Sequence, residues 1–214
     1  MNNLLTEFNG IKDIKKGSLV LLAARPFFSK TAFSYNIAYN MINNNQKVKI
    51  YSFERNKEEI EEIIKIISKQ ESYNQNNLTI DYNLNNTLES IINNSRNYDL
   101  IIIETLQKFN IQPNEINKLK ELAINNNCVV ILISELPSEI DEREDKQPLL
   151  TDLNSQIIDN VDKVLFMYGD YYYNKKYTDK MIIELTIIDI KTNKIKKYKL
   201  LKKQDRYTFT NYNE

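Results

Sequence analysis

The sequence has no histidine, no tryptophan, one cysteine, three glycines and four prolines among its 214 residues. Without histidine, Ser-His-Asp and Cys-His nucleophilic triads and all histidine-ligated metal sites are excluded. The single cysteine, Cys128, excludes an intrachain disulfide and is typical of a reducing compartment. We interpret Cys128 as a small buried apolar residue.

Neither sign of charge predominates, because 29 basic residues balance 29 acidic ones. No field of the whole molecule then steers it toward nucleic acid or membrane, so any such partner must meet a local patch. No apolar run reaches membrane-spanning length, and Met1 to Phe8 lacks the pattern of a signal peptide. We expect a soluble, cytoplasmic protein without a membrane partner, folded as a single domain over residues 1–214.

Apolar runs of strand length alternate with stretches of helical period. Strands are predicted at Leu19–Ala23, Val48–Phe53, Leu78–Ile80, Leu100–Ile103, Val129–Ile133 and Val164–Met167, and helices at Lys30–Ile42, Lys57–Ile67, Leu88–Ile92 and 116–124. Continuous branched runs between helices are typical of parallel strands that are covered on both faces. Two alternating segments, Met181–Ile190 and Lys194–Leu201, predict a hairpin at the sheet edge. The predicted class is therefore α/β, with a mostly parallel sheet, helices on both faces and a C-terminal antiparallel hairpin.

The first predicted strand runs into the octamer Ala24-Arg25-Pro26-Phe27-Phe28-Ser29-Lys30-Thr31 and then into a helix. This is the position and spacing of a phosphate-binding loop at a helix N-terminus. In such a loop Lys30 would reach the β- and γ-phosphates of a nucleotide, and Thr31 would hold Mg²⁺. The octamer has no glycine, so taken alone it is a weak signal for nucleotide binding.

Further segments extend this pattern in a fixed order along the chain. Around the octamer they are Gly17–Val20, Ala23–Pro26, Lys30–Phe33 and Asn36–Ala38; after it come Ser52–Glu54, Ile101–Gln107, Ile133–Leu136 and Leu165–Tyr168. The loop after Leu136 carries Arg143, Asp145, Lys146, Pro148, Asp152 and Leu153. Together these segments resemble the ATPase core of DnaB-type replicative helicases. The resemblance covers roughly residues 10–212 and implies a RecA-like P-loop NTPase core without the family's N-terminal domain.

The resemblance implies a role for each residue of a nucleotide site. The residues that would bind the nucleotide are Ala24, Arg25, Pro26, Ser29, Lys30, Thr31 and Ala32. Glu54 falls on the family's catalytic glutamate, and Glu104 falls on its magnesium-associated aspartate, so that Thr31 and Glu104 would hold the metal. Glu135 falls on a glutamine near the γ-phosphate, and Lys191 falls in the pair that the family sends into the neighbouring subunit's site.

Several positions depart from the family pattern. Ser29 replaces a glycine, and its Cβ crowds the backbone where phosphates approach. Glu135 puts a carboxylate near the γ-phosphate, and two like charges at 4 Å repel by roughly 4 kcal/mol at an effective dielectric of 20. The first position of the trans pair is Asp189, and loss of an arginine finger typically costs about 10³ to 10⁵ in turnover. We therefore expect binding of ATP and Mg²⁺ to be weakened or lost.

Three functional hypotheses follow. The leading one is a degenerate, stand-alone DnaB-like module that acts in DNA replication with impaired or absent ATP hydrolysis, its partners being a replicative helicase or its loading machinery. The second is an active Mg·ATP-dependent helicase motor, in which Lys191 substitutes for the finger in trans. The third is a switch that binds ATP without turnover. Whether the chain contacts DNA stays open, because Lys108–Glu115 and Asp152–Asp162 are short where the family lines its channel. The oligomeric state stays open as well.

Structural interpretations compete with these functional ones. Glu54 and Glu104 could be helix caps or surface carboxylates. The lysines from Lys194 to Lys203 could contact phosphate backbones, although protection of an edge strand is the favoured interpretation. Tyr171–Tyr173 could stack on bases, although packing on the hairpin is favoured. For Phe27 and Phe28 a core position, a partner contact and a plug over the phosphate site all stay open.

Overall fold

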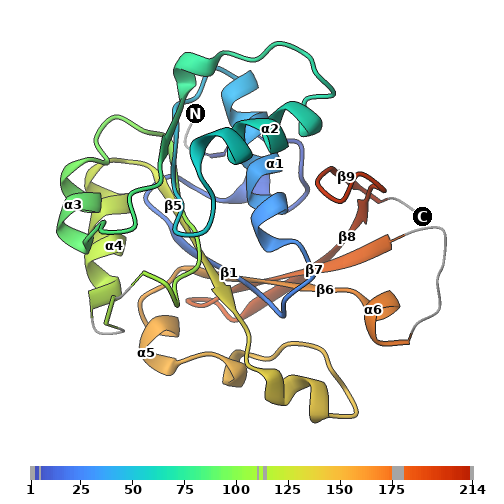
Figure 1. Cartoon of the computed structure of the whole chain (residues 1–214). Coiled ribbons are helices and arrows are strands. Elements are labelled where there is room, and N and C mark those ends of the chain that lie inside the picture. Colours follow the sequence, from blue (N-terminus) through green and yellow to red (C-terminus); the bar gives the residue numbers. More distant parts are fainter. Residues whose placement is uncertain (1–2, 5, 110, 113–114, 175–180, 213–214) are drawn as a thin grey trace.

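A computed structural model describes residues 3–4, 6–109, 111–112, 115–174 and 181–212. Its centre is a nine-stranded sheet with the order β3-β2-β4-β5-β1-β6-β7-β8-β9 (Figure 1). The strands are β1 (Leu19–Ala24), β2 (Val48–Tyr51), β3 (Leu78–Asp81), β4 (Leu100–Ile103), β5 (Val129–Glu135), β6 (Lys163–Tyr168), β7 (Met181–Asp189), β8 (Lys194–Lys202) and β9 (Phe209–Asn211). The strands from β3 to β6 in this order are parallel, and β7 to β9 continue the sheet antiparallel. The predicted α/β class is confirmed.

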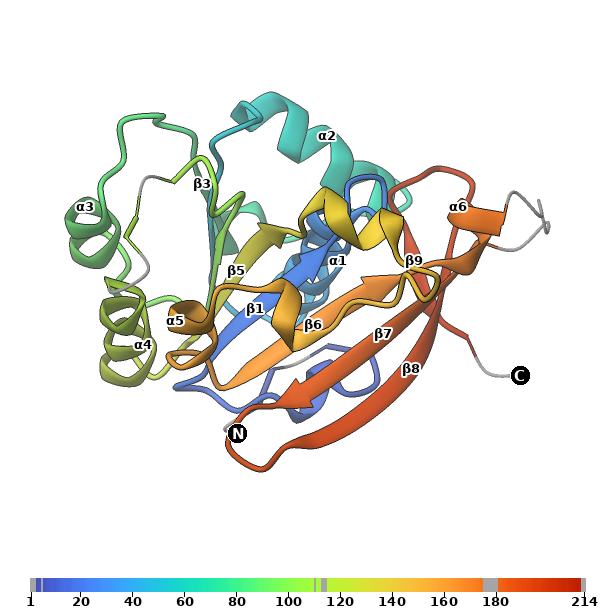
Figure 2. The same ribbon diagram turned by 90° about the horizontal axis from the view of Figure 1, so that it is seen from below.

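Helices cover both faces of this sheet (Figures 1 and 2). The α-helices are α1 (Lys30–Asn43), α2 (Lys57–Ile67), α3 (Leu88–Asn93), α4 (Ile116–Asn125), α5 (Ser155–Ile158) and α6 (Asp170–Asn174). Short 3-10 turns are η1 (Ile11–Asp13), η2 (Gln75–Asn77), η4 (Ser138–Glu142) and η5 (Leu150–Asp152). The helices α1 and α2 pack on one face and α3 and α4 on the other, which gives two apolar cores.

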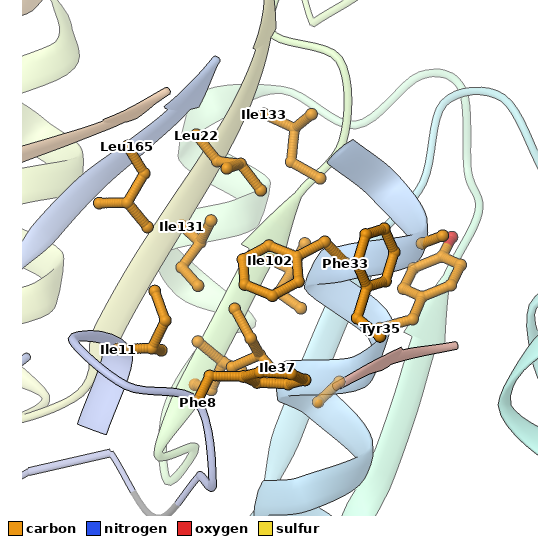
Figure 3. Close-up of a cluster of buried hydrophobic side chains, with 14 of the residues drawn as sticks. Phe8, Ile11, Leu22, Phe33, Tyr35, Ile37, Ile102, Ile131, Ile133 and Leu165 are labelled. Atoms are coloured by element: carbon orange, nitrogen blue, oxygen red, sulfur yellow. The ribbon is translucent and has the colours of Figure 1, made fainter. Parts of the chain in front are cut away.

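The central strands are buried at every residue because both of their faces are covered. In β1, β2 and β4 no position is exposed, which explains their continuous apolar sequences. Alternate residues of one strand supply the two cores, so that Leu22 points to the α1 side and Leu21 to the α4 side. Figure 3 shows the α1-side core, where Phe33 and Ile37 of α1 meet Leu22, Ile102 and other strand residues.

The helices differ in how much of their surface is buried. In α2 the isoleucines at 60, 63, 64 and 67 form one buried face, and Asn56 and Glu59 close a capping box. In contrast, α1 is buried on most sides. The Asn36 side chain donates to the Tyr207 carbonyl and accepts from the Phe209 N–H, which ties α1 to the C-terminal strand β9.

The carboxyl ends of the parallel strands meet at one edge of the sheet. Ala24 pairs with Glu135, and Tyr51 pairs with Ile103, so the chain leaves these strands at the same level. The loops after β1, β2, β4 and β5 therefore share this edge. Since β1 has β5 on one side and β6 on the other, the loop after β1 opens at a topological switch point, where open α/β sheets bind ligands.

Most predicted elements are confirmed, with local differences. The hairpin of β7 and β8 forms as predicted, with its turn at residues 190–193. The strand predicted to reach Phe53 ends at Tyr51: the Ser52 N–H makes a last bond to the Asp81 carbonyl of β3, and the chain then turns toward α2. The short strand β9, which lacks an alternating pattern, was not predicted. Cys128 is buried, as expected.

Two other predictions concern the C-terminal third. The favoured packing of Tyr171–Tyr173 on the hairpin is only part of the arrangement, because these residues form α6 and Tyr172 and Tyr173 contact Phe28. Of the lysines interpreted as edge protection, Lys202 is 9% exposed, so it does not serve that role. Among the described residues, no helix combines the length and apolar character required to cross a membrane.

Candidate functional site

The loop between β1 and α1, where the sequence predicts phosphate binding, contains no glycine and has two residues with positive φ. Phe27 has φ 73° and Ser29 has φ 59° and ψ 38°, both in the left-handed region. The Ser29 side chain does not cap α1. The first N–H groups of a helix have no intrahelical partner, so this helix start is suited to an anion.

Lys30 lies at the mouth of this loop and is 7% exposed. Its Nζ is 3.4 Å from the carbonyl oxygen of Arg25 and 3.9 Å from Oε1 of Glu135. Burial lowers the pKa of the Lys30 ammonium, although Glu135 and Glu54 act in the opposite direction. The lysine predicted to bind phosphate is thus held near the loop by a carboxylate of its own chain.

Arg25 belongs to the predicted loop, but its side chain serves a different contact. The guanidinium donates from Nε and Nη2 to Oδ2 of Asp141, at 3.1 and 2.7 Å, and from Nη1 to the Leu136 carbonyl at 2.9 Å. Only the Arg25 carbonyl oxygen contacts Lys30. The Arg25 side chain therefore ties the loop to η4.

Glu54 follows β2 and lies at the site as an ionised carboxylate. Oε1 accepts from Oγ1 of Thr105 at 2.9 Å and lies 3.2 Å from Nζ of Lys108. Burial acts to raise the pKa of Glu54, but the contacts with Thr105 and Lys108 outweigh it and the pKa is lowered. Such a group can accept a proton or orient a water molecule.

Glu104, directly after β4, has the opposite character. It is fully buried, and its Oε2 accepts from Oγ of Ser52 at 2.6 Å. Burial raises its pKa, against the effect of the Ser52 hydroxyl. Among the described residues Oε1 makes no hydrogen bond of ordinary geometry, and neither does the Tyr35 hydroxyl, but this hydroxyl lies close enough to act with Ser52 against the raised pKa of Glu104. Figure 3 shows this hydroxyl directed away from the apolar cluster.

A pocket of about 360 Å³ joins these parts. Its lining includes Pro26, Ser29, Lys30, Thr31 and Ala32 from the loop, and Glu54 and Glu135 from the neighbouring strand ends. The sequence predicted these residues for the site, and the structure brings them together. Glu104 is not part of the lining, and Ala24 ends β1 below it.

Sequence reasoning missed six further residues of the lining. They are Tyr35, Arg55, Ile63, Lys202, Arg206 and Tyr207. Burial lowers the pKa of Lys202, and the nearby Arg206 adds to that effect. Arg55 was detectable because it directly follows Glu54. In contrast, Lys202 and Arg206 reach the pocket only because α1 contacts the C-terminal strands. The added cations suit a polyanionic ligand.

Lys191 lies away from this pocket. It sits in the turn between β7 and β8, at the opposite edge of the sheet, and its Nζ is 3.1 Å from Oδ1 of Asp162. The structure thus does not bring Lys191 to the site of its own chain. The predicted role in a neighbouring subunit's site stays a prediction.

The residues of the pocket fit a nucleotide phosphate group, because Lys30 and the start of α1 offer positive charge and N–H donors. For a magnesium ion the pocket supplies the Thr31 hydroxyl, and Mg²⁺ in nucleotide sites takes few protein ligands besides phosphate oxygens. Glu104, the other predicted ligand, is fully buried outside the lining, so its role at the metal stays a prediction.

Comparison with known proteins identifies the family. Residues 4–117 and 61–211 match the model of the DnaB-like helicase C terminal domain. The replicative DNA helicase DnaB of Geobacillus stearothermophilus is 28% identical over 218 residues, which cover 81% of this chain and 48% of that protein. A probable plasmid replicative DNA helicase of Chlamydia psittaci is 28% identical over 207 residues, or 77% and 45% of the two chains. This chain spans about half the length of the curated relatives it matches.

Solved structures share the fold. A DnaB-like replicative helicase, described with its interactions with primase, superposes with a TM-score of 0.79 at 24% identity, over 92% of this chain and 59% of that one. A KaiC-like protein of Pyrococcus horikoshii gives a TM-score of 0.67 at 14% identity, over 100% and 98% of the two chains. At these identities the two structures show a common RecA-like fold alone. The family model, which spans nearly the whole chain, decides the matter: this chain belongs to the DnaB-like helicase C-terminal domain family.

Proposed function

We propose that this chain is a DnaB-like module of DNA replication that binds ATP weakly and hydrolyses it slowly or not at all. The observation that carries the proposal is the 3.9 Å contact between Nζ of Lys30 and Oε1 of Glu135. The cation expected to meet the terminal phosphates already faces a carboxylate. A triphosphate has to displace this carboxylate before the Lys30 ammonium can bind the terminal phosphates.

The charge of Glu135 opposes a bound phosphate as well as competing for Lys30. At about 4 Å and an effective dielectric of 20, the repulsion between two negative charges is roughly 4 kcal/mol. The Glu135 side chain is 49% exposed, so it can rotate into solvent and avoid most of this cost. Binding is therefore weakened, and abolition is not required.

The other residues divide the work of a nucleotide site. Lys30 and the N–H groups at the start of α1 bind phosphate oxygens, and Thr31 with Glu104 would hold the magnesium ion. ATP would supply the phosphoryl group that is transferred to water. Glu54, ionised and fixed by Thr105, is the group that would orient that water molecule.

A second candidate is a working motor, and one observation favours it. Glu54 lines the pocket with its pKa lowered, which is the state that a catalytic carboxylate requires. In that case Lys191 would act in the site of a neighbouring copy, and its release from Asp162 would come first. A switch that binds ATP without turnover uses the same contacts up to the hydrolysis step.

Titration with a fluorescent ATP analogue and Mg²⁺, followed by a phosphate-release assay, tests the proposal. We expect weak saturable binding that Lys30→Ala abolishes and Glu135→Gln strengthens by about tenfold, because the neutral amide removes the competing charge. Glu139→Gln, an acidic residue four positions further on, serves as the matched control and should change nothing. Turnover by the unaltered chain at helicase-like rates would contradict the proposal and support the motor.

The proposed partners are a replicative helicase or the proteins that load it. Primase is a further candidate, because the DnaB-like replicative helicase that shares this fold is described with its interactions with primase. Pull-down of each purified protein by this chain, with sedimentation to measure oligomeric state and a DNA-binding titration, distinguishes these partners. A ring-shaped hexamer whose ATP hydrolysis is stimulated by DNA would contradict the proposal that this chain is a binding module.

A further inference from the structure

The phosphate-binding loop, residues 24–31, adopts a conformation that side chains rarely take. Both Phe27 and Ser29 have positive φ, at 73° and 59°. For residues with a Cβ this region is costly, and such a conformation persists only where the surroundings enforce it. In phosphate-binding loops glycine normally removes the cost. The structure therefore has to contain something else that holds this loop.

One support is an ionic tether formed by Arg25, Asp141 and Tyr173. Arg25 donates twice to Oδ2 of Asp141, and the Tyr173 hydroxyl donates to Oδ1 at 2.8 Å. Both carboxylate oxygens are thereby engaged, one by the loop and one by α6. The hydrogen bond from Arg25 is also the main cause that lowers the pKa of Asp141. Figure 1 shows η4, in yellow, and α6, in orange, at the same end of the sheet as the loop.

The second support is aromatic. Phe28 is 1% exposed, and its ring centroid lies 5.3 Å from that of Tyr172 and 6.0 Å from that of Tyr173. Phe27, although 73% exposed, stacks on Tyr172 at 5.8 Å with an angle of 18° between the rings. Each of the two phenylalanines thus fixes one side of the strained segment.

One of the three glycines lies beneath this aromatic support. A Cβ on Gly169 would come within 2.6 Å of Cε1 of Tyr171 and 3.1 Å of Cε1 of Phe28. A side chain at this position would therefore displace the Tyr171 ring and press more weakly on the Phe28 ring, so Gly169 leaves room for the close packing of both rings.

We propose that Asp141 is a positioning residue for the phosphate-binding loop: together with the tyrosines of α6 it enforces the positive-φ backbone that glycine provides in other loops of this kind. This proposal rests on the proposed function, in that the shape it preserves is the one that binds phosphate. Asp141 does not line the pocket, and it acts on the loop through Arg25 and through Tyr173, whose ring contacts Phe28.

The test compares two acidic residues of one segment. Asp141→Ala breaks the tether to the loop, whereas Asp152→Ala breaks the Arg143 ion pair of 2.9 Å, which does not involve the loop. We expect Asp141→Ala to raise the Kd for a fluorescent ATP analogue with Mg²⁺ at least tenfold and to speed hydrogen exchange in residues 24–33 of the nucleotide-free protein at least tenfold. Asp152→Ala should leave both within twofold. Tyr173→Phe, a milder change, should shift both two- to threefold in the same direction.

Rescue separates positioning from general structural damage. Adding Ser29→Gly to Asp141→Ala removes the Cβ that makes the loop conformation costly, so the Kd should return to within about threefold of the unaltered protein. The proposal is overturned if exchange in 24–33 is the same in Asp141→Ala and Asp152→Ala, or if the double variant binds as weakly as Asp141→Ala. If the unaltered protein binds no nucleotide, the proposed function fails, and the exchange comparison still decides the role of Asp141.

Discussion

Carboxylates at the amino ends of the parallel strands are more completely paired than those at the carboxyl ends. At the amino ends of the strands, Asp162 accepts from the Leu19 N–H and from Lys120, and Lys191 completes its surroundings. Burial acts to raise the pKa of Asp162, but these donors outweigh it and the pKa is lowered. At the same edge Asp189 accepts from Lys163 and twice from Thr192.

At the carboxyl ends the carboxylates are less completely paired. Glu104 is fully buried with one oxygen unpartnered among the described residues, and Glu135 shares Lys30 at a distance of 3.9 Å. Positive φ occurs at both edges, but the amino-end loops have it at asparagines such as Asn45, Asn97 and Asn127, which tolerate it, whereas the carboxyl-end loops have it at Phe27, Ser29 and Thr105. The carboxylates at the amino ends thus stabilise the fold, whereas the carboxyl ends retain backbone strain and unpaired polar atoms. Such features cluster at ligand sites, where a bound partner completes them.

The largest effect in this comparison is expected at the amino ends of the strands. Asp162→Ala should lower the free energy of unfolding by about 2 to 3 kcal/mol, because it removes the acceptor of the Leu19 N–H and the counter-charge of the partly buried Lys120, which keeps only the Gly17 carbonyl among the described residues. Urea unfolding at pH 7 measures it. Asp159→Ala, an exposed change three residues earlier, should stay within about 0.5 kcal/mol. Equal losses in the two variants would remove the distinction between the edges.

At the carboxyl ends of the strands, removing a carboxylate should have the opposite effect on the free energy of unfolding. Glu104→Gln should leave the protein as stable or more stable by about 1 kcal/mol at pH 8, since a buried carboxyl with raised pKa resists ionisation and the amide cannot ionise. The unfolded chain ionises Glu104 above its ordinary pKa of 4.5, while the folded chain keeps the proton up to the raised value. As the pH rises through this window, the unaltered protein therefore loses stability and the Glu104→Gln variant does not. Unfolding curves from pH 4 to 9 check this, and a difference independent of pH would contradict it.

The smallest effect concerns Asp189 and appears in acid. Its pKa is lowered from 3.8 to about 2, mainly by the hydrogen bond from Lys163. The stabilisation is present above pH 3.8 and is lost as the pH falls toward 2. Because the pair is partly exposed, Asp189→Asn should cost under about 1 kcal/mol at pH 6 and nothing near pH 2. The cost should shrink in 1 M salt, and a cost that persists at pH 2 would mean that packing, not charge, is lost.

The sequence predicted what depends on local pattern. Continuous runs such as Leu100–Ile103 predicted buried parallel strands. The octamer was correctly placed between a strand and a helix. These features follow from period and spacing, which one segment carries by itself. Glu54, Glu104 and Glu135, in contrast, were selected through the resemblance to the helicase family.

What depends on contacts between distant segments was not predictable. Lys202 looks like its neighbours in the lysine run, and only the packing of α1 against the C-terminal strands turns it into the pocket. Phe28 has no local partner, and its place in the core comes from tyrosines of α6. Whether Glu104 keeps its proton depends on its burial, which raises its pKa, and on the Ser52 and Tyr35 hydroxyls, which act to lower it. No spacing rule contains either effect.

The support of the loop by distant residues has a consequence for the order of folding. Arg25 and Asp141 lie 116 residues apart in the chain, and Gly169 comes later still. A loop shaped by its own glycines forms from local backbone preference, whereas contacts of such separation form only after a large closure of the chain. The β1–α1 loop, although it precedes η4 and α6 in the chain, is therefore expected to reach its final shape only once β6 and α6 have folded.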